Sequence, residues 1–152
     1  MRNVFRTAGG LAVTAIAAMA LDSGAVNQLQ QTAQRLERDA TSVQQSLKNK
    51  KHDAPAVKAK IESMTTDVGA LDQLAKQIDD ANPQLSGRDQ AEWVKIRQLI
   101  HIITALHQSK ERAASEDLVK NRGLVRDYAA GVALRAKLLQ GALTQLSRGP
   151  VS

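Results

Sequence analysis

The feature that most constrains this fold is a set of apolar residues that recur at alternating spacings of three and four. Such a heptad pattern places all of its members on one face of an α-helix. Two segments carry it most clearly: Val26, Leu29, Ala33, Leu36, Ala40, Val43 and Leu47 in one, and Val57, Ile61, Met64, Val68, Leu71, Ala75 and Ile78 in the other. No segment shows the apolar–polar alternation of a half-buried strand, so the pattern predicts an all-α fold.

The same periodicity continues in two later segments. One contains Trp93, Ile96, Ile100, Ile103 and His107, and the other contains Leu118, Val125, Tyr128, Val132, Ala136, Leu139, Leu143 and Leu146. Beside the third stripe, Leu99, Ile102 and Leu106 predict a wider buried arc. Four amphipathic helices joined by short links favour an up-down-up-down four-helix bundle. A three-helix or extended coiled-coil arrangement with an oligomeric core is the alternative.

The expected helices span residues 24–48, 55–81, 87–113 and 116–148, within a single domain of residues 21–152. Asp53 and Pro55 suit the cap and the first turn of the second helix, and Pro83 should end it. Ser115, followed by two acidic residues, predicts the start of the fourth helix, because these groups favour the positive end of the helix dipole. Since residues 110–114 are all helix-forming, one kinked helix across this boundary is the alternative.

The first twenty residues have the layout of a secretory signal peptide. A short basic segment precedes fourteen uncharged residues, Ala8–Leu21, and small residues predict cleavage after Ala20 or, alternatively, after Ala25. A membrane-spanning helix needs about 20 apolar residues, so this segment is short for one. We therefore expect an exported protein, periplasmic or secreted. An uncleaved membrane anchor and a buried N-terminal helix are the alternatives.

Composition excludes several kinds of function. The chain has no cysteine, which excludes disulfides, thiolate metal sites and a cysteine nucleophile. Only 2% of the residues are aromatic, which argues against base-stacking surfaces for single-stranded nucleic acid. The export signal also disfavours a nucleic-acid partner. Removing residues 1–20 takes away Arg2 and Arg6 and lowers the net charge from +6 to +4.

The remaining positive charge is expected to gather at one end of the bundle, where the first and third links meet. That end would hold ten cations and five acids: Lys48, Lys50, Lys51, Lys58, Lys60, Lys110, Arg112, Lys120, Arg122 and Arg126, against Asp53, Glu62, Glu111, Glu116 and Asp117. A basic end attracts anionic lipid headgroups, acidic polymers or acidic proteins. The alternative is a solvated surface that keeps the protein soluble. The candidate contact residues are Lys48, Lys50, Lys51, Lys58 and Lys60.

The sequence shows no clear signature of catalysis or of cofactor binding, with His107 as the one residue of interest. No glutamate lies three residues before a histidine, as a di-iron bundle requires. His107 stands out because it lies within an apolar stripe and, in a helical hairpin, near the level of Met64. These two side chains could ligate haem in the bundle core. The alternative is a histidine at the core edge, hydrogen-bonded to Asn121 or to a water, with Met64 filling space.

These observations favour a non-enzymatic, exported helical bundle without a cofactor, acting as a binding, chaperone-like or structural module of the cell envelope. Its partner would be a protein or an anionic envelope surface, and the heptad stripes offer a second copy of the chain as an alternative. A haem-binding bundle that uses His107 and Met64, and an enzyme whose site forms only in the folded chain, are the other hypotheses.

Overall fold

Four helices follow one another along the chain, and local sequence signals set their ends. The computed structural model describes residues 21–85 and 87–148, and within these residues it contains α1 (Ser23–Ser46), α2 (Ala54–Ala81), α3 (Gly87–Glu116) and α4 (Arg122–Ser147) and no strand. The expected all-α architecture is therefore confirmed. The expected signal peptide, residues 1–20, lies outside the described residues.

Side-chain caps explain where the first two helices begin and where α2 ends. Asp22 and Asp53 each accept a hydrogen bond from a backbone N–H in the first turn, at 2.9 and 3.2 Å, and so stabilise the starts of α1 and α2. Pro55 lies in the first turn of α2, as predicted from the sequence. At the other end of α2, the amide of Asn82 donates to the Ile78 carbonyl at 2.9 Å.

The boundary between the third and fourth helices differs from the prediction. α3 runs three residues beyond the expected end at 113, Ser115 lies inside it, and α4 begins at Arg122 rather than at 116. The predicted serine cap is wrong because the preceding helix-forming residues continue α3. The link is instead stabilised by Asp117, whose carboxylate accepts hydrogen bonds from the N–H groups two and three residues later, at 3.1 and 3.0 Å. Two separate helices result, not one kinked helix.

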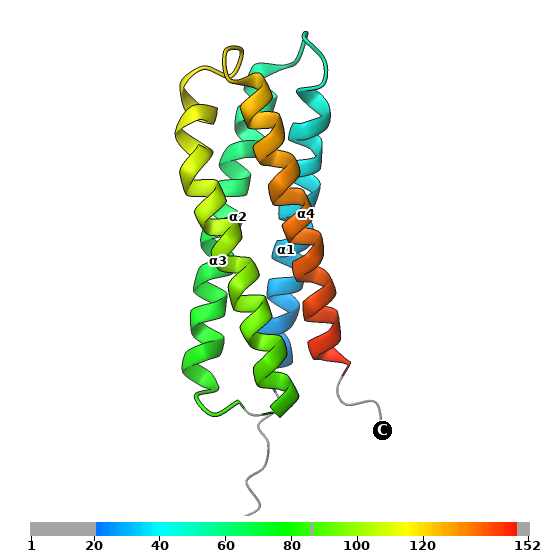
Figure 1. Ribbon diagram of the computed structural model, residues 1–152, viewed down its shortest axis with the longest axis vertical. Coiled ribbons are helices and arrows are strands. Elements are labelled where there is room, and N and C mark those ends of the chain that lie inside the picture. The colour runs from blue at the N-terminus through cyan, green and yellow to red at the C-terminus, as the bar shows by residue number, and fades with distance from the viewer. Residues whose placement is uncertain (1–20, 86, 149–152) are drawn as a thin grey trace, which may run out of the picture.

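The helices form a four-helix bundle in which each packs against two neighbours (Figure 1). α1 contacts α2 and α4, and α3 contacts the same two helices from the other side. Consecutive helices run in opposite directions. The α1–α2 and α3–α4 links therefore share one end of the bundle, the upper end in Figure 1, while the α2–α3 link, the start of α1 and the end of α4 lie at the opposite end.

The core consists of the four apolar stripes, whose members are at most 9% exposed. The heptad stripes of α1 and α2 pack inside a single chain instead of remaining open for a second copy. The wider buried arc expected on α3 is only partly present, because Ile102 is 44% exposed while Leu99 and Leu106 pack against the core edge. At the lower end, Trp93 of α3 is buried and its indole N–H donates to Asp79 of α2 at 2.6 Å.

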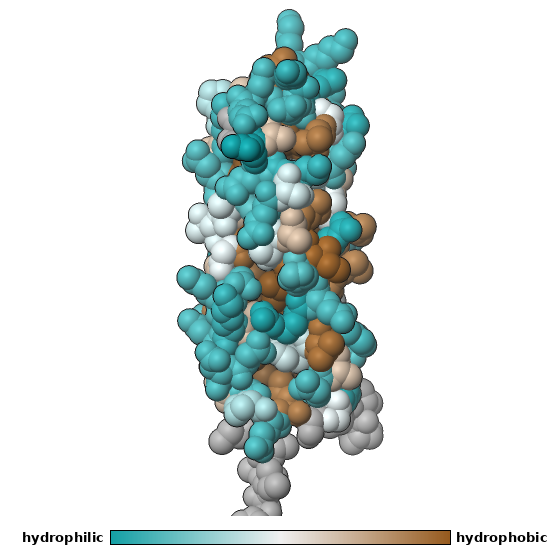
Figure 2. All heavy atoms as spheres, turned by 60° about the vertical axis from the view of Figure 1, so that its left-hand side comes forward, coloured by the Kyte–Doolittle hydropathy of each residue, from teal (hydrophilic) through white to brown (hydrophobic). Residues whose placement is uncertain are grey.

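Exposed apolar side chains are distributed unevenly over the surface. Figure 2 shows a face that is largely hydrophilic on its left and carries apolar side chains along its middle and right. Within the described residues, every large apolar side chain that is exposed belongs to α3, α4 or the link between them: Val94, Ile102, Val119, Leu124, Leu134 and Leu138. None of the helices over residues 21–85 and 87–148 combines the length and hydropathy that crossing a bilayer would require.

Candidate functional site

The first candidate site is the end of the bundle that carries the α1–α2 link. Leu47 and Val57 are buried on either side of this link and fix its two ends to the core. Between them, Lys48, Lys50 and Lys51 are exposed, because a short link over the end of a bundle has no neighbouring helix to cover it. We use "basic end" below for Lys48, Lys50, Lys51 and Lys58, the last of which is exposed in the first turns of α2.

Ion pairing separates Lys60 from the rest of the predicted contact set. The Lys60 ammonium lies 3.4 Å from the carboxylate of Asp39 in α1, which also accepts a hydrogen bond from Ser63 at 2.8 Å. The structure therefore assigns Lys60 a partner within the chain, which the sequence could not indicate because the two residues are 21 positions apart. The four residues of the basic end have no carboxylate within 4 Å among the described residues.

The acidic residues near this end mostly have local partners. Asp53 caps α2, and Asp117 holds the α3–α4 link, so each carboxylate is engaged with backbone N–H groups. Glu116 pairs with Arg112 one turn away, at 3.4 Å. The negative charges of these acids still lower the local potential, but their hydrogen bonds and ion pairs are made with neighbouring residues of the chain and not with the lysines of the basic end. The lysines of the basic end are left facing solvent.

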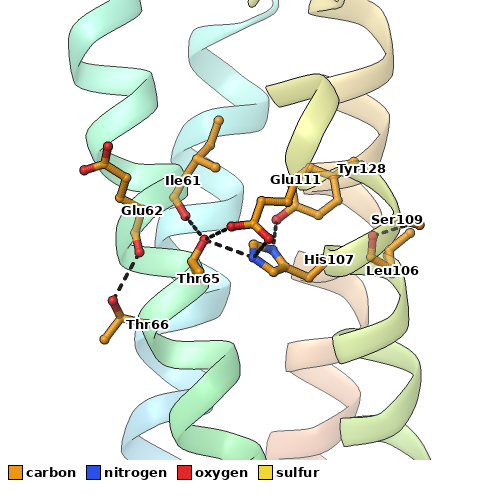
Figure 3. A network of polar contacts seen from close by, with 9 residues as sticks. All are labelled: Ile61, Glu62, Thr65, Thr66, Leu106, His107, Ser109, Glu111 and Tyr128. Carbon is orange, nitrogen blue, oxygen red and sulfur yellow. Dashed lines mark hydrogen bonds and ion pairs between the residues drawn. The ribbon is translucent and has the colours of Figure 1, made fainter. Parts of the chain in front are cut away.

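The second candidate site is a buried polar cluster around His107, which joins three helices (Figure 3). His107 of α3 is 3% exposed, and its Nδ1 atom lies 2.5 Å from the hydroxyl of Tyr128 in α4, which is equally buried. Its Nε2 atom lies 3.0 Å from the hydroxyl of Thr65 in α2. Glu111, one turn along α3, approaches the same nitrogen to 3.9 Å and is half-exposed.

The hydrogen-bond partners determine which nitrogen of His107 carries the proton. The Thr65 hydroxyl has one proton, and its two other neighbours, the Ile61 carbonyl at 3.1 Å and the Glu111 carboxylate at 3.4 Å, can only accept it. Thr65 must therefore accept from Nε2–H of His107, leaving Nδ1 to accept from the Tyr128 hydroxyl. Neutral His107 thus satisfies both neighbours through a chain of hydrogen bonds that runs from α4 through α3 to α2.

Burial determines the ionisation of this cluster. Loss of solvent lowers the pKa of His107 below its ordinary value of 6.5, and the nearby charge of Glu111 opposes this only in part. Burial also raises the pKa of Tyr128 well above its ordinary value, and the negative charge of Glu111 acts in the same direction. Both side chains are therefore neutral near pH 7, which suits the hydrogen-bond pattern.

Met64 is fully buried and precedes Thr65, whose hydroxyl contacts His107. Met64 and His107 therefore lie at a similar height along the bundle, as the sequence predicted. Both ring nitrogens of His107 already have a hydroxyl within hydrogen-bond distance. Ligation of haem iron at either nitrogen would require the loss of one of these contacts. The expected neighbour Asn121 does not reach His107; its amide donates to the Ala113 carbonyl at 2.9 Å.

Sequence reasoning missed the partners of His107. Tyr128 belonged to the predicted core stripe, but nothing in its spacing revealed that its hydroxyl faces a histidine 21 residues earlier. The signal that could have found it is the need of a buried tyrosine hydroxyl for a partner. Thr65, beside a core methionine, carried no comparable signal. Over the described residues, no group of three or more His, Asp and Glu side chains is placed to hold a metal ion.

Comparison with known proteins adds no relative: no family model, no curated protein and no solved structure matches this chain significantly.

Proposed function

We propose that the protein is exported to the cell envelope and acts there, without catalysis, as a four-helix binding module whose basic end contacts an anionic surface. Export is supported by the signal-peptide pattern of residues 1–20. The binding role is supported by exposed lysines at one end of the bundle that have no ion-pair partner among the described residues. The His107 cluster fits a structural role, because His107 and Tyr128 are each 3% exposed and are engaged with one another.

The observation that carries the proposal is that four exposed lysines at one end lack the carboxylate neighbour that other cations of the bundle have. Lys76, Lys95 and Arg97, towards the lower end, each have a carboxylate within 2.8 to 3.1 Å. Lys48, Lys50, Lys51 and Lys58 have no such partner among the described residues. Unpaired cations project a stronger field, which falls off over about 10 Å at 0.1 M salt, so a binding surface must approach this end closely.

The experiment measures binding of the protein to vesicles that contain phosphatidylglycerol and, separately, to soluble polyphosphate, at several salt concentrations. The test variant is Lys48→Gln/Lys50→Gln/Lys51→Gln. Each lysine near an anionic membrane contributes about 1 kcal/mol, so the triple variant should lose about 100-fold in vesicle affinity. Binding of the unaltered protein should weaken as salt is raised.

The matched control is Lys76→Gln/Lys95→Gln/Lys137→Gln, which removes the same charge from the sides of the bundle. At a rise of 1.5 Å per residue, these positions lie about 20 to 33 Å from the basic end, beyond the screening length at 0.1 M salt. The control should therefore bind nearly as well as the unaltered protein. Equal loss in both variants, or no binding to either anionic target, would refute the proposed role of the basic end.

Export has its own test. The protein recovered from the envelope or the medium should begin at Leu21, or at Val26 if the alternative cleavage site is used. Intact-mass measurement of the fractionated protein distinguishes these outcomes. Recovery only inside the cell, with Met1 to Ala20 still attached, would contradict export.

A further inference from the structure

A single exposed apolar side chain marks the α3–α4 link, at the same end of the bundle as the basic end. Val119 is 75% exposed, which is the largest value of any large apolar side chain in the described part of the chain. A polar residue is the usual choice at such a position in a turn. Val119 is therefore the most accessible apolar side chain that this end of the bundle offers to a partner.

The link holds Val119 in this exposed position through several contacts. Leu118, the preceding residue, is 2% exposed and anchors the link in the core, so that its neighbour faces away. The carboxylate of Asp117 accepts hydrogen bonds from the N–H groups of Val119 and Lys120, at 3.1 and 3.0 Å. Asn121 closes the link with a backbone bond to the Asp117 carbonyl at 3.0 Å. Val119 is thus presented by an ordered turn, which lowers the entropy cost of inserting it into a partner.

Cations outnumber acids at the end of the bundle that carries Val119, although the exposed carboxylates of Glu116 and Asp117 precede it in the chain. Lys120 follows Val119 directly and is exposed, and the α1–α2 link with Lys48, Lys50 and Lys51 lies at the same end of the bundle (Figure 1). This end of the bundle therefore combines one exposed apolar side chain, Val119, with several lysines.

This combination matches the interface of an anionic phospholipid bilayer. Lysines bind the headgroups, while an apolar side chain enters the boundary between headgroups and acyl chains. A soluble polyanion would satisfy the lysines but would leave Val119 in water. We infer that the basic end docks end-on onto an anionic phospholipid bilayer, with Val119 inserted at the boundary between headgroups and acyl chains. This inference rests on the proposed function.

The absence of cysteine allows a direct test with a single fluorescent label. Val119→Cys carries an environment-sensitive fluorophore at the link, and Leu134→Cys carries it on the side of α4, where Leu134 is 59% exposed. With phosphatidylglycerol vesicles, emission from position 119 should shift to the blue and increase, while emission from position 134 should not change. A shift at 134 without one at 119 would show side-on binding and overturn the inference.

A second comparison separates insertion from charge attraction. Val119→Asn leaves every charge in place, so it should lower vesicle affinity by between about fivefold and tenfold while leaving polyphosphate binding unchanged. The control Leu134→Asn should change neither. If the lysine variants weaken binding but Val119→Asn does not, the basic end acts by charge alone and the bilayer inference fails while the proposed function stands. If the unaltered protein binds neither target, both fail.

Discussion

The hydrogen bond between His107 and Tyr128 provides a quantitative test of the buried cluster. The two atoms lie 2.5 Å apart, and both residues are 3% exposed, so water cannot replace either partner. Removing one partner of such a pair costs about 1 to 3 kcal/mol, because the other is left buried and unpaired. Tyr128→Phe leaves Nδ1 of His107 without a donor, and His107→Leu leaves the Tyr128 hydroxyl without an acceptor. Each should destabilise the protein by about 2 kcal/mol.

The double variant should cost less than the sum of the two single variants. It removes both polar groups, and Thr65 keeps its hydrogen bond to the Ile61 carbonyl. We therefore expect a coupling free energy of about 1 to 2 kcal/mol in a double-mutant cycle. Urea unfolding followed by circular dichroism measures all four free energies of unfolding, provided that the slopes with denaturant agree.

A distant pair serves as the control for this cycle. Thr144 of α4 donates to the Gln140 carbonyl within its own helix, at 2.9 Å. Thr144→Val combined with Tyr128→Phe should therefore be additive. A coupling between His107 and Tyr128 below about 0.3 kcal/mol, which is within the error of additivity, would refute the view that the two side chains depend on each other.

Three further predictions concern stability. Because burial lowers the pKa of His107, the unfolded chain binds this proton more tightly than the folded chain does. The free energy of unfolding should therefore keep the full contribution of His107 above pH 6.5 and lose it below, by at most about 1.4 kcal/mol per pH unit. The urea midpoints of His107→Leu should not show this pH dependence. Gly141→Ala should raise the free energy of unfolding by about 0.5 to 1 kcal/mol, since the new Cβ would meet nothing within 4 Å. Gly131→Ala should raise it less, because the new Cβ would lie 3.1 Å from a leucine of α3. Equal gains in the two variants would contradict this contact. Leu71→Ala should cost about 2 to 5 kcal/mol at a fully buried position, and Leu134→Ala on the surface less than about 0.5 kcal/mol, so similar thermal shifts in the two would contradict the core assignment.

The helices and the core were predictable because they depend on short-range periodicity. The stripes of α1 and α2, such as Val26 to Leu47, needed only the spacing of apolar residues, and Asp53 with Pro55 needed only local capping rules. The α3–α4 boundary was placed wrongly, because α3 continues past Ser115 and α4 begins at Arg122, after Asn121, whose side chain makes no capping hydrogen bond. Local capping signals therefore did not indicate this start, and the link before it is held by Asp117 instead.

The details of the candidate sites depended on contacts between residues far apart in the chain. The Lys60–Asp39 pair and the Tyr128 and Thr65 partners of His107 each join different helices. Their formation depends on the rotation of one helix relative to another, which periodicity alone leaves uncertain by a fraction of a turn. The end of the bundle where the lysines gather was predictable, because it follows from the order of the links alone.

The positions of the two aromatic residues in the core have an optical consequence. Trp93, bonded to Asp79, lies towards one end of the bundle, and Tyr128, bonded to His107, lies towards the other. Each is the only residue of its type in the chain. Tryptophan fluorescence and tyrosine absorbance therefore monitor opposite ends of the same molecule without any added label. Coincident unfolding curves would mean that both ends open in one cooperative step, whereas an earlier tyrosine transition would mean that the lysine-bearing end loosens first.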